Sequence, residues 1–365
     1  MMFVALLSLL IWVYLVLLHG RFWSSTPELP PATPSELPDV DIVIPARDEA
    51  ETIGPVIASL LAQDYKGRFR LFLVDDNSTD GTATQAGTAP NLAVITGQPK
   101  PDGWSGKLWA VSQGTVASSA PVLLFADADI VHDPRHLSAL VNKLQQPVDM
   151  VSEMVRLNCV SLAERALVPA FVYFFQMLYP FARVNDPRST VAAAAGGTVL
   201  IRRAALERIG GIAAIRNALI DDVTLAKAVK GTGAAIYLGH SGLATSIRPY
   251  PDWRDLWQMI ARTAFTQLRY SALLLLLTLV GLTLVWLVPV GAMLFGRDLA
   301  RSTGLAAFVL AGLSYLPTLT RYRQSPLWAL VLPLIALFYM AATLGSALNY
   351  WFGRGARWKN RAYGS

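Results

Sequence analysis

The sequence predicts an α/β domain attached to a membrane, and three observations lead to this class. Short apolar segments alternate with helical patterns between residues 40 and 270. Acidic clusters directly follow two of those apolar segments. Uncharged apolar stretches lie near both ends of the 365-residue chain, which is 53% hydrophobic and only 15% charged. Ordinary soluble domains carry about 25% charged residues, so the deficit indicates membrane segments.

The apolar stretches are long enough to cross a bilayer. Residues 1–19 contain no Asp, Glu, Lys or Arg and match a hydrocarbon core of about 30 Å. A cleaved signal peptide is the alternative, but it would want a basic start and a small-residue cleavage site. We interpret residues 1–20 as an uncleaved anchor. Residues 272–296 and 326–350 are further spans and 303–320 a weaker one, which predicts two or three transmembrane helices within 272–350.

The net charge of +6 indicates an anionic membrane surface as partner. The basic residues flank the apolar segments, and no basic motif with interleaved aromatics suggests nucleic acid. If residues 40–270 are cytoplasmic, four crossings would place the basic tail, residues 351–365, outside, against the usual preference of basic tails. The number of crossings stays open. The single cysteine, Cys159, excludes an intrachain disulfide.

Between the membrane segments the pattern is that of alternating strands and helices. Residues 21–39 are rich in Pro and Ser and predict a semi-rigid linker. Strands are expected at 40–44, 71–74, 91–97 and 121–130, with helices from about residue 52 and over 106–119. This alternation implies right-handed crossovers and a mostly parallel, Rossmann-like sheet covered on both faces. Residues 251–271 predict an interfacial amphipathic helix.

The acidic clusters fall where such sheets bind ligands, at the carboxyl ends of strands. Asp75-Asp76 ends one strand, and Asp127-Ala-Asp129 ends another. Asp75-Asp76 alone would more often be a helix cap, and Asp-Ala-Asp alone is a weak motif that occurs by chance in many loops. Two clusters at one sheet edge favour a ligand site. A D-x-D pair supplies the carboxylate oxygens that Mg²⁺ or Mn²⁺ shares with substrate phosphates.

A third acidic pair, Asp221-Asp222, follows a segment rich in small residues that contains Gly196-Gly197. One interpretation is a helix first turn whose carboxylates favour the helix dipole. The other is a general base, beside glycines that let a substrate approach the backbone closely.

Six motifs follow one another in a specific order: DIVIPARDEAETI, LVDDNSTDGT, GKLWAVSQG, LLFADAD, AAGGTVLIRRAALERIGG and DDVTLAKAV. In this order, residues 40–270 resemble the inverting glycosyltransferases of family 2. The N-terminal anchor, the segment RTAFTQLRYS and the apolar C-terminal part make the chain similar to the hopene-associated glycosyltransferases of bacterial hopanoid gene clusters.

The resemblance implies an A-type glycosyltransferase fold over residues 40–250, a nucleotide-sugar donor (a UDP-sugar is expected), a Mg²⁺ or Mn²⁺ cofactor and a lipid acceptor. It further implies the bacterial inner membrane, with the catalytic domain cytoplasmic. The residues implied at the donor are Pro45, Arg47, Glu49, Asp75 or Asp76 at the base, and Lys107 and Asp127 at the diphosphate. Asp127 and Asp129 match the metal pair, and Asp222 matches the catalytic base. The acceptor side would hold Gly196, Gly197, Asp221, Gln258, Arg262, Gln267 and Arg269.

The chain departs from the family at one motif. Membrane-bound relatives often carry Q-x-x-R-W, whereas here Gln258 with Arg262, or Gln267 with Arg269 and Tyr270, gives no strict match. This puts processive polymer synthesis in doubt. Two other hypotheses remain, a polyprenyl-phosphate glycosyltransferase and a non-catalytic nucleotide-binding membrane protein. The absence of a G-x-x-x-x-G-K-[ST] loop argues against a P-loop NTPase.

Overall fold

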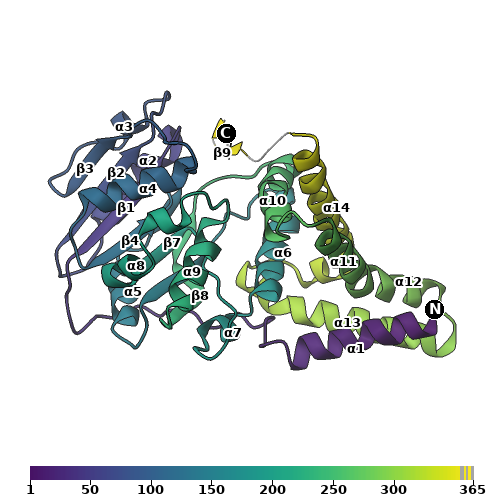
Figure 1. Cartoon of the computed structure of the whole chain (residues 1–365). Helices are drawn as coiled ribbons and strands as arrows, with labels where there is room; N and C mark the ends of the chain where they lie inside the picture. The colour runs from purple at the N-terminus through teal and green to yellow at the C-terminus, as the bar shows by residue number, and fades with distance from the viewer. Residues whose placement is uncertain (354–356, 359–360, 363–365) are drawn as a thin grey trace. The chain divides into compact units, whose positions relative to one another are not determined.

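The computed structural model describes residues 1–353, 357–358 and 361–362, and the chain divides into two compact units (Figure 1). The sheet unit contains Thr26–Asn158, Arg183–Pro249 and the described part of the C-terminal tail. The helical unit contains Met1–Ser25, Cys159–Ala182 and the described residues 250–353. The expected domain at 40–250 is therefore interrupted, because its apolar insertion, residues 159–182, belongs to the helical unit. The predicted basic tail lies partly outside the described residues.

The sheet unit is built on an eight-stranded mixed sheet with the order β3-β2-β1-β4-β7-β6-β8-β5. β1 pairs in parallel with β2 and β4, as do β2 with β3 and β6 with β8, whereas β7 runs antiparallel to β4 and β6, and β5 antiparallel to β8. The strands are β1 (Val40–Ala46), β2 (Phe69–Asp75), β3 (Leu92–Thr96), β4 (Val122–Ala126), β5 (Ile130–His132), β6 (Met150–Arg156), β7 (Thr198–Arg202) and β8 (Ile236–Ser246).

The expected mostly parallel sheet is thus only partly parallel. The four strands recognised in the sequence, β1 to β4, form the parallel half, in which helices connect consecutive strands. β5 instead follows β4 after a three-residue turn, too short for the crossover that a parallel neighbour requires. The helices of this unit are α2 (Ala50–Leu61), α3 (Thr82–Gln85), α4 (Gly106–Ala117), α5 (His136–Leu144), α8 (Arg203–Arg208), η1 (Ile212–Ile215) and α9 (Asp221–Gly231). The short α7 (Phe181–Asn185) lies where the chain re-enters the unit.

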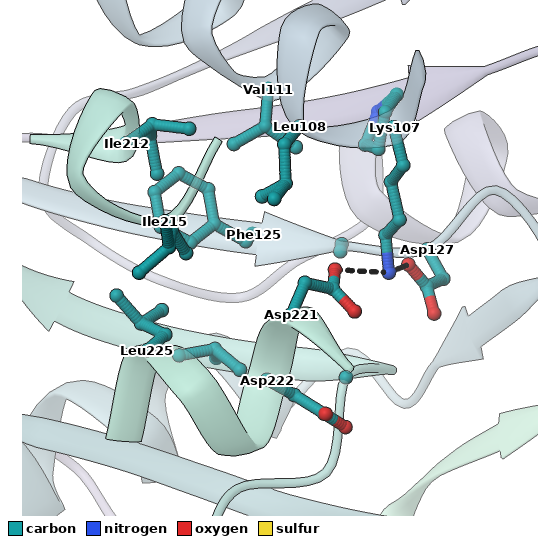
Figure 2. A pocket seen from close by; sticks show the side chains of 14 residues that line it. Lys107, Leu108, Val111, Phe125, Asp127, Ile212, Ile215, Asp221, Asp222 and Leu225 are labelled. Atoms are coloured by element: carbon teal, nitrogen blue, oxygen red, sulfur yellow. Dashed lines mark ion pairs between the residues drawn. The ribbon is translucent and has the colours of Figure 1, made fainter. Parts of the chain in front are cut away.

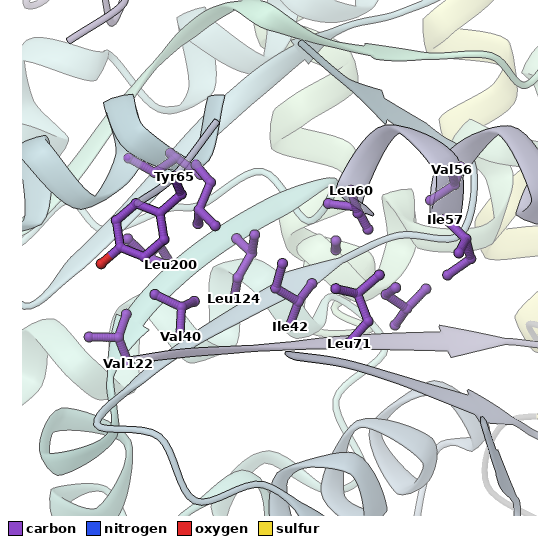
Figure 3. Close-up of a cluster of buried hydrophobic side chains, with 14 of the residues drawn as sticks. Val40, Ile42, Val56, Ile57, Leu60, Tyr65, Leu71, Val122, Leu124 and Leu200 are labelled. Atoms are coloured by element: carbon purple, nitrogen blue, oxygen red, sulfur yellow. The ribbon is translucent and has the colours of Figure 1, made fainter. Parts of the chain in front are cut away.

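Helices cover both faces of the parallel half. Alternate residues of β1, Val40, Ile42 and Ile44, belong to one buried cluster with the apolar residues of α2 and α5 (Figure 3). α4 packs on the opposite face, where a Cβ on Gly114 would come within 2.4 Å of the Val43 side chain. Glycine at this position therefore allows the helix to approach the sheet closely.

The middle of the expected linker is packed against the sheet unit. Leu29 is buried in the main core, and the His240 N–H of β8 donates to the Pro27 carbonyl at 2.8 Å. Burial of the leucine side chain fixes this extended segment on the sheet unit.

The helical unit contains three stretches that are long and apolar enough to cross a membrane: Ala272–Phe295, Asp298–Arg321 and Pro326–Trp351. Their elements are α11 (Ala272–Leu282), the π-helical turn η2 (Thr283–Leu287), α12 (Val288–Phe295), α13 (Asp298–Arg321), η3 (Pro326–Val331) and α14 (Leu332–Trp351). The unit also contains α1 (Met2–Leu17), α6 (Leu162–Leu178) and the predicted amphipathic helix α10 (Trp253–Gln267), which begins with a capping box at Asp252.

The N-terminal helix α1 docks onto the interrupted part of the first of these stretches. Pro289 has no N–H and so cannot bond back to the π-helical turn that precedes it. In that turn, the carbonyl of Val285 accepts from Trp12 Nε1 at 2.8 Å. One turn earlier on α1, the Ser8 hydroxyl donates to the carbonyl of Leu284 at 2.7 Å. α1 is therefore an integral packing element of the helical unit. At 16 residues it is shorter than the other three stretches, and its role as a membrane-crossing anchor stays a prediction.

Candidate active site

Three turns meet at the carboxyl edge of the parallel strands. β2, β1 and β4 are neighbours in the sheet and run in the same direction, so the chain leaves all three at one edge. Residues 47–49 follow β1, residues 76–80 follow β2, and Asp127–Asp129 follow β4. This is the edge at which open α/β sheets bind ligands.

The residues predicted near the nucleotide base are engaged in shaping two of these turns. The Asp75 carboxylate accepts from the N–H of Ser78 at 3.0 Å, as expected of a turn residue. Asp76 is fully buried, and the Arg47 guanidinium donates to its carbonyl and lies 3.8 Å from its carboxylate. The N–H of Glu49 donates to the Thr82 hydroxyl at 2.8 Å. Asp75 and Asp76 thus both have partners within the protein. Contact of either residue with a nucleotide base stays a prediction.

A small pocket of about 30 Å³ gathers predicted residues from distant parts of the chain (Figure 2). Lys107 Nζ, at the start of α4, lies 2.8 Å from the Asp127 carboxylate and 3.1 Å from that of Asp221. Asp222 follows in the first turn of α9, and Gly196 lies against it. A Cβ on Gly196 would come within 3.3 Å of the Asp222 carboxylate and 3.6 Å of Lys107 Nζ, so the glycine makes room for both. Pro45 also lines the pocket.

The ionisable groups of the pocket have shifted pKa values. Burial raises the pKa of Asp222 to about 7, the neighbouring Asp221 adds to the rise, and Lys107 offsets only part of it. Burial also raises the pKa of Asp127, against the effect of Lys107. Burial alone would lower the pKa of Lys107, but Asp127 and Asp221 outweigh it and hold that pKa well above its usual value. Lys107 therefore stays cationic, while Asp222 exchanges its proton near neutral pH, as a general base requires.

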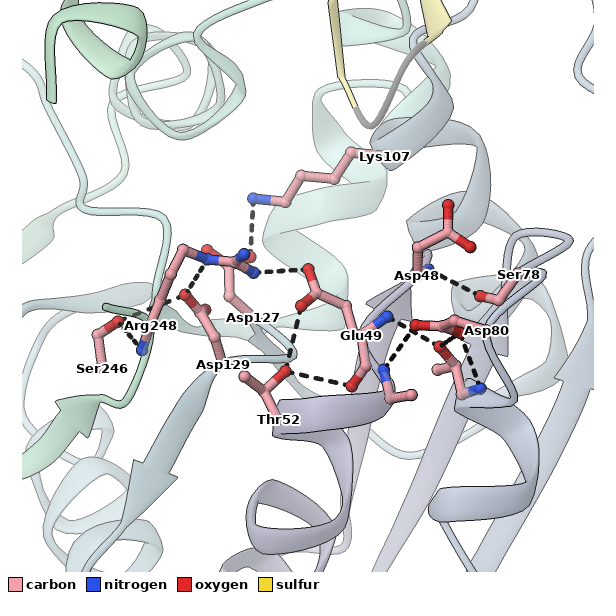
Figure 4. A network of polar contacts seen from close by, with 12 residues as sticks. Asp48, Glu49, Thr52, Ser78, Asp80, Lys107, Asp127, Asp129, Ser246 and Arg248 are labelled. Carbon is pink, nitrogen blue, oxygen red and sulfur yellow. Dashed lines mark hydrogen bonds and ion pairs between the residues drawn. The ribbon is translucent and has the colours of Figure 1, made fainter. Parts of the chain in front are cut away.

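A second cation, Arg248, completes the site, and the sequence analysis missed it. Its Nε lies 2.8 Å from the Asp129 carboxylate, and Nη2 lies 2.6 Å from that of Glu49 (Figure 4). The Ser246 hydroxyl donates to the same Asp129 carboxylate at 3.3 Å. Arg248 follows the end of β8, about 120 residues after the D-x-D pair. The one signal for Arg248 in the sequence was indirect: clustered carboxylates need positive charges nearby.

The donor set fits a hard divalent cation. Five carboxylates, those of Glu49, Asp127, Asp129, Asp221 and Asp222, share two cations, Lys107 and Arg248. Carboxylate oxygens with an excess of negative charge suit Mg²⁺ or Mn²⁺, which completes its shell with water and substrate phosphate. Among the described residues, no group of three or more His, Cys, Asp or Glu has the arrangement of a metal-ligand set. The protein would thus supply Asp127 and Asp129 and leave the remaining positions to the substrate and water.

The remaining acceptor candidates are not all in this pocket. Gly197 supports the D-x-D turn, since its carbonyl accepts from the Asp127 N–H at 3.3 Å. Gln258 and Arg262 are exposed and one turn apart on α10, in the helical unit. Gln267 donates to the Tyr179 hydroxyl, and Arg269 has a positive φ of 53° just after α10. The roles of these residues toward an acceptor stay predictions.

The chain is similar to known glycosyltransferases in sequence. Residues 41–210 match the family described as glycosyl transferase family 2. An uncharacterised glycosyltransferase of Mycobacterium bovis is 34% identical over 113 residues, which cover 31% of this chain and 47% of that protein. The beta-monoglucosyldiacylglycerol synthase of a Synechocystis strain is 26% identical over 248 residues, 57% of this chain and 49% of that protein. The chain thus spans about half the length of these curated relatives.

The fold has a counterpart among solved structures. A mannosyltransferase from Pyrobaculum calidifontis, solved in complex with GDP-Man and Mn²⁺, superposes with a TM-score of 0.55 at 19% identity. The alignment covers 96% of this chain and 99% of that one. The mixed, Rossmann-like sheet is that of the A-type glycosyltransferases, as the resemblance implied. The match to glycosyl transferase family 2 lies within this fold, over residues 41–210, just under half of the chain.

Proposed function

We propose that the chain is an inverting, membrane-bound glycosyltransferase that moves a sugar from a nucleotide-sugar to a lipid acceptor. The observation that carries the proposal is the half-buried cluster of Lys107, Asp127, Asp221 and Asp222 at the ligand-binding edge of the sheet. It combines a cation for a leaving diphosphate with a carboxylate whose pKa is raised to about 7.

The residues divide the chemistry between them. Asp222 takes the proton of the acceptor hydroxyl as that oxygen attacks the anomeric carbon. Lys107 stabilises the negative charge that develops on the departing nucleoside diphosphate. A divalent cation held by Asp127 and Asp129 would act as a Lewis acid on the same diphosphate. A single displacement by the acceptor oxygen inverts the anomeric centre, as the resemblance to the inverting glycosyltransferases implies.

The nature of the donor and the metal follows from the same site. Mg²⁺ or Mn²⁺ fits the carboxylates, and the structural counterpart was solved with Mn²⁺ and a nucleotide-sugar. From the resemblance we expect a UDP-sugar. We further propose a role in hopanoid biosynthesis at the bacterial inner membrane, with the sheet unit in the cytoplasm. In support of the membrane, the helical unit has three stretches of sufficient length and apolarity.

A groove in the helical unit supports a lipid acceptor. It has a volume of about 410 Å³, within the range of ligand pockets, and its lining is apolar and aromatic: Leu167, Trp253, Trp328, Val331, Leu334, Ile335 and Phe338. It begins at the first residues of the apolar stretch Pro326–Trp351, where interfacial tryptophans are expected. The Arg254 guanidinium lies 5.6 Å from the Trp253 ring centre and places a cation at the rim. We propose that the groove holds the apolar body of the acceptor lipid.

Filling this groove should weaken acceptor use selectively. Leu334 lines the groove and is 68% exposed, whereas Leu337, on the same helix and 46% exposed, does not line it. In Leu334→Trp we expect the apparent KM for the lipid to rise about tenfold, because burial of even two methylene groups stabilises by about 0.8 kcal/mol each. Leu337→Trp is the matched control, and donor KM should be unchanged in both. If Leu334→Trp and Leu337→Trp have the same KM for the acceptor lipid, the groove is not the binding site of that lipid.

The pH dependence should report the proposed base. Asp222 accepts a proton only when it is ionised, and its pKa of about 7 lies above the usual carboxyl range. As pH falls through 7, Asp222 becomes protonated, and kcat/KM should fall about tenfold per pH unit. The profile is measured with saturating metal between pH 5 and 9. A flat profile down to pH 5 would exclude Asp222 as the titrating base.

The activity itself is tested in two steps. The detergent-solubilised protein is screened with a panel of nucleotide-sugars and Mn²⁺ by thermal shift. The donor that stabilises it is then incubated with membrane lipids, and the products are identified by mass spectrometry. A new glycosylated lipid supports the proposal, and donor hydrolysis without a labelled lipid contradicts the acceptor class.

A further inference from the structure

The two carboxylates of the D-x-D pair are already occupied by cations of the protein itself. Lys107 lies against Asp127, and Arg248 lies against Asp129, each at 2.8 Å. A small pocket of about 30 Å³, room for about one water molecule, lies beside Lys107 and Asp127.

Arg248 is held in this position by the fold rather than by chance contact. β5 and β8 pair with Ile130 opposite Ser246, which fixes the end of β8 beside Asp129. The Ile247 N–H donates to the Asp129 carbonyl at 2.9 Å. The second arm of the guanidinium reaches Glu49, at the N-terminus of α2. The arginine thus links the turn after β1, the turn after β4 and the segment after β8.

A metal ion and the Arg248 guanidinium would compete for the Asp129 carboxylate. Its carboxylate side chain is 13% exposed, so a metal ion that enters must displace the Arg248 guanidinium or share the carboxylate with it. A charge-assisted hydrogen bond in such a place opposes that exchange. A bound diphosphate changes the balance, because it offers the released guanidinium a new anionic partner.

We propose that Arg248 acts as a stand-in cation for the metal, so that the divalent ion binds weakly to the donor-free protein and strongly with a nucleoside diphosphate. Arg248 is on this view a positioning residue, which acts on the metal through Asp129. This inference rests on the proposed function, since it requires a metal-assisted diphosphate site. By linkage, the diphosphate must raise metal affinity by the same factor that the metal raises diphosphate affinity.

The test measures Mn²⁺ binding to the full-length, detergent-solubilised protein by electron paramagnetic resonance, without any donor. Arg248→Gln should bind Mn²⁺ about tenfold more tightly than wild type, because the loss of a charge-assisted bond removes a competitor of at least this size. Arg248→Lys, which keeps the charge, should stay near wild type. A merely structural role would predict the opposite sign, with weaker metal binding in Arg248→Gln.

A matched control exists in the same unit. Arg70 makes a paired contact with buried Asp41 at 3.0 Å, on the strands β2 and β1, so Arg70→Gln removes a comparable bridge without touching Asp129. It should leave Mn²⁺ affinity unchanged. Addition of Asp129→Asn to Arg248→Gln should abolish the gain in affinity.

The second measurement adds UDP or GDP as the probe diphosphate. In wild type the better of the two should raise Mn²⁺ affinity strongly, and in Arg248→Gln this enhancement should shrink. Unchanged or weaker donor-free Mn²⁺ binding in Arg248→Gln would overturn the inference, whether or not sugar transfer is observed. If Mn²⁺ binds as expected but no sugar is transferred by the wild type, the proposed function fails and the inference does not.

Discussion

Asp222→Asn should abolish sugar transfer while leaving the donor site intact. The amide cannot accept the acceptor proton, and general-base catalysis typically contributes about 10²–10⁴ in rate. We therefore expect kcat to fall by about this factor. Since Asp222 makes no ion pair of its own among the described residues, Mn²⁺-dependent donor binding should change little. Single-turnover transfer and donor binding by calorimetry measure the two quantities separately.

The same substitution distinguishes the two acceptor hypotheses. A lipid phosphate needs little deprotonation, so a polyprenyl-phosphate glycosyltransferase should lose much less than tenfold in kcat. Asp186→Asn serves as the control, because Asp186 lies in the same unit but pairs with exposed Arg188 at the surface. Full transfer activity in Asp222→Asn would show that another group acts as the base.

Asp127→Ala should remove metal-dependent donor binding. The substitution deletes one of two proposed metal ligands and leaves Lys107 paired with Asp221 alone. Lys107 would then be drawn away from the position of the leaving diphosphate. Loss of such preorganised electrostatic stabilisation typically costs about 10²–10³ in kcat. We expect both this fall and the loss of the thermal stabilisation that Mn²⁺ and donor give together.

Asp133→Ala is a suitable control for that experiment. Asp133 follows β5, pairs with exposed Arg135 at 2.8 Å, and is only six residues from Asp127. Its removal should affect neither transfer nor stabilisation. If Asp127→Ala keeps the wild-type response to Mn²⁺ in the thermal shift, the metal assignment is falsified, although Lys107 and Asp222 could still act without it.

Much of the sheet unit could be predicted because its signals are local. The apolar runs of β1, β2, β3 and β4 and the capping and turn residues between them are contained in short windows. The placement of Asp127 at a strand end followed from the apolar run before it. β5, β6, β7 and β8 were not recognised. The short antiparallel strands β5 and β7 depend on β8 and β6 for hydrogen bonds, which no local pattern reveals.

By itself, the sequence determined the parallel half of the sheet, the apolar stretches and the types of residue at the site. Those properties depend on the periodicity and chemistry of neighbouring residues. Only the tertiary structure decided that Lys107 lies between Asp127 and Asp221, and that Arg248 lies between Asp129 and Glu49. These contacts join residues 20 to 199 positions apart, and only the packed sheet brings them together. The neighbouring carboxylates of Asp127 and Asp129, which would repel each other, are thus each paired with a cation. The local sequence pattern does not show which cation pairs with which carboxylate.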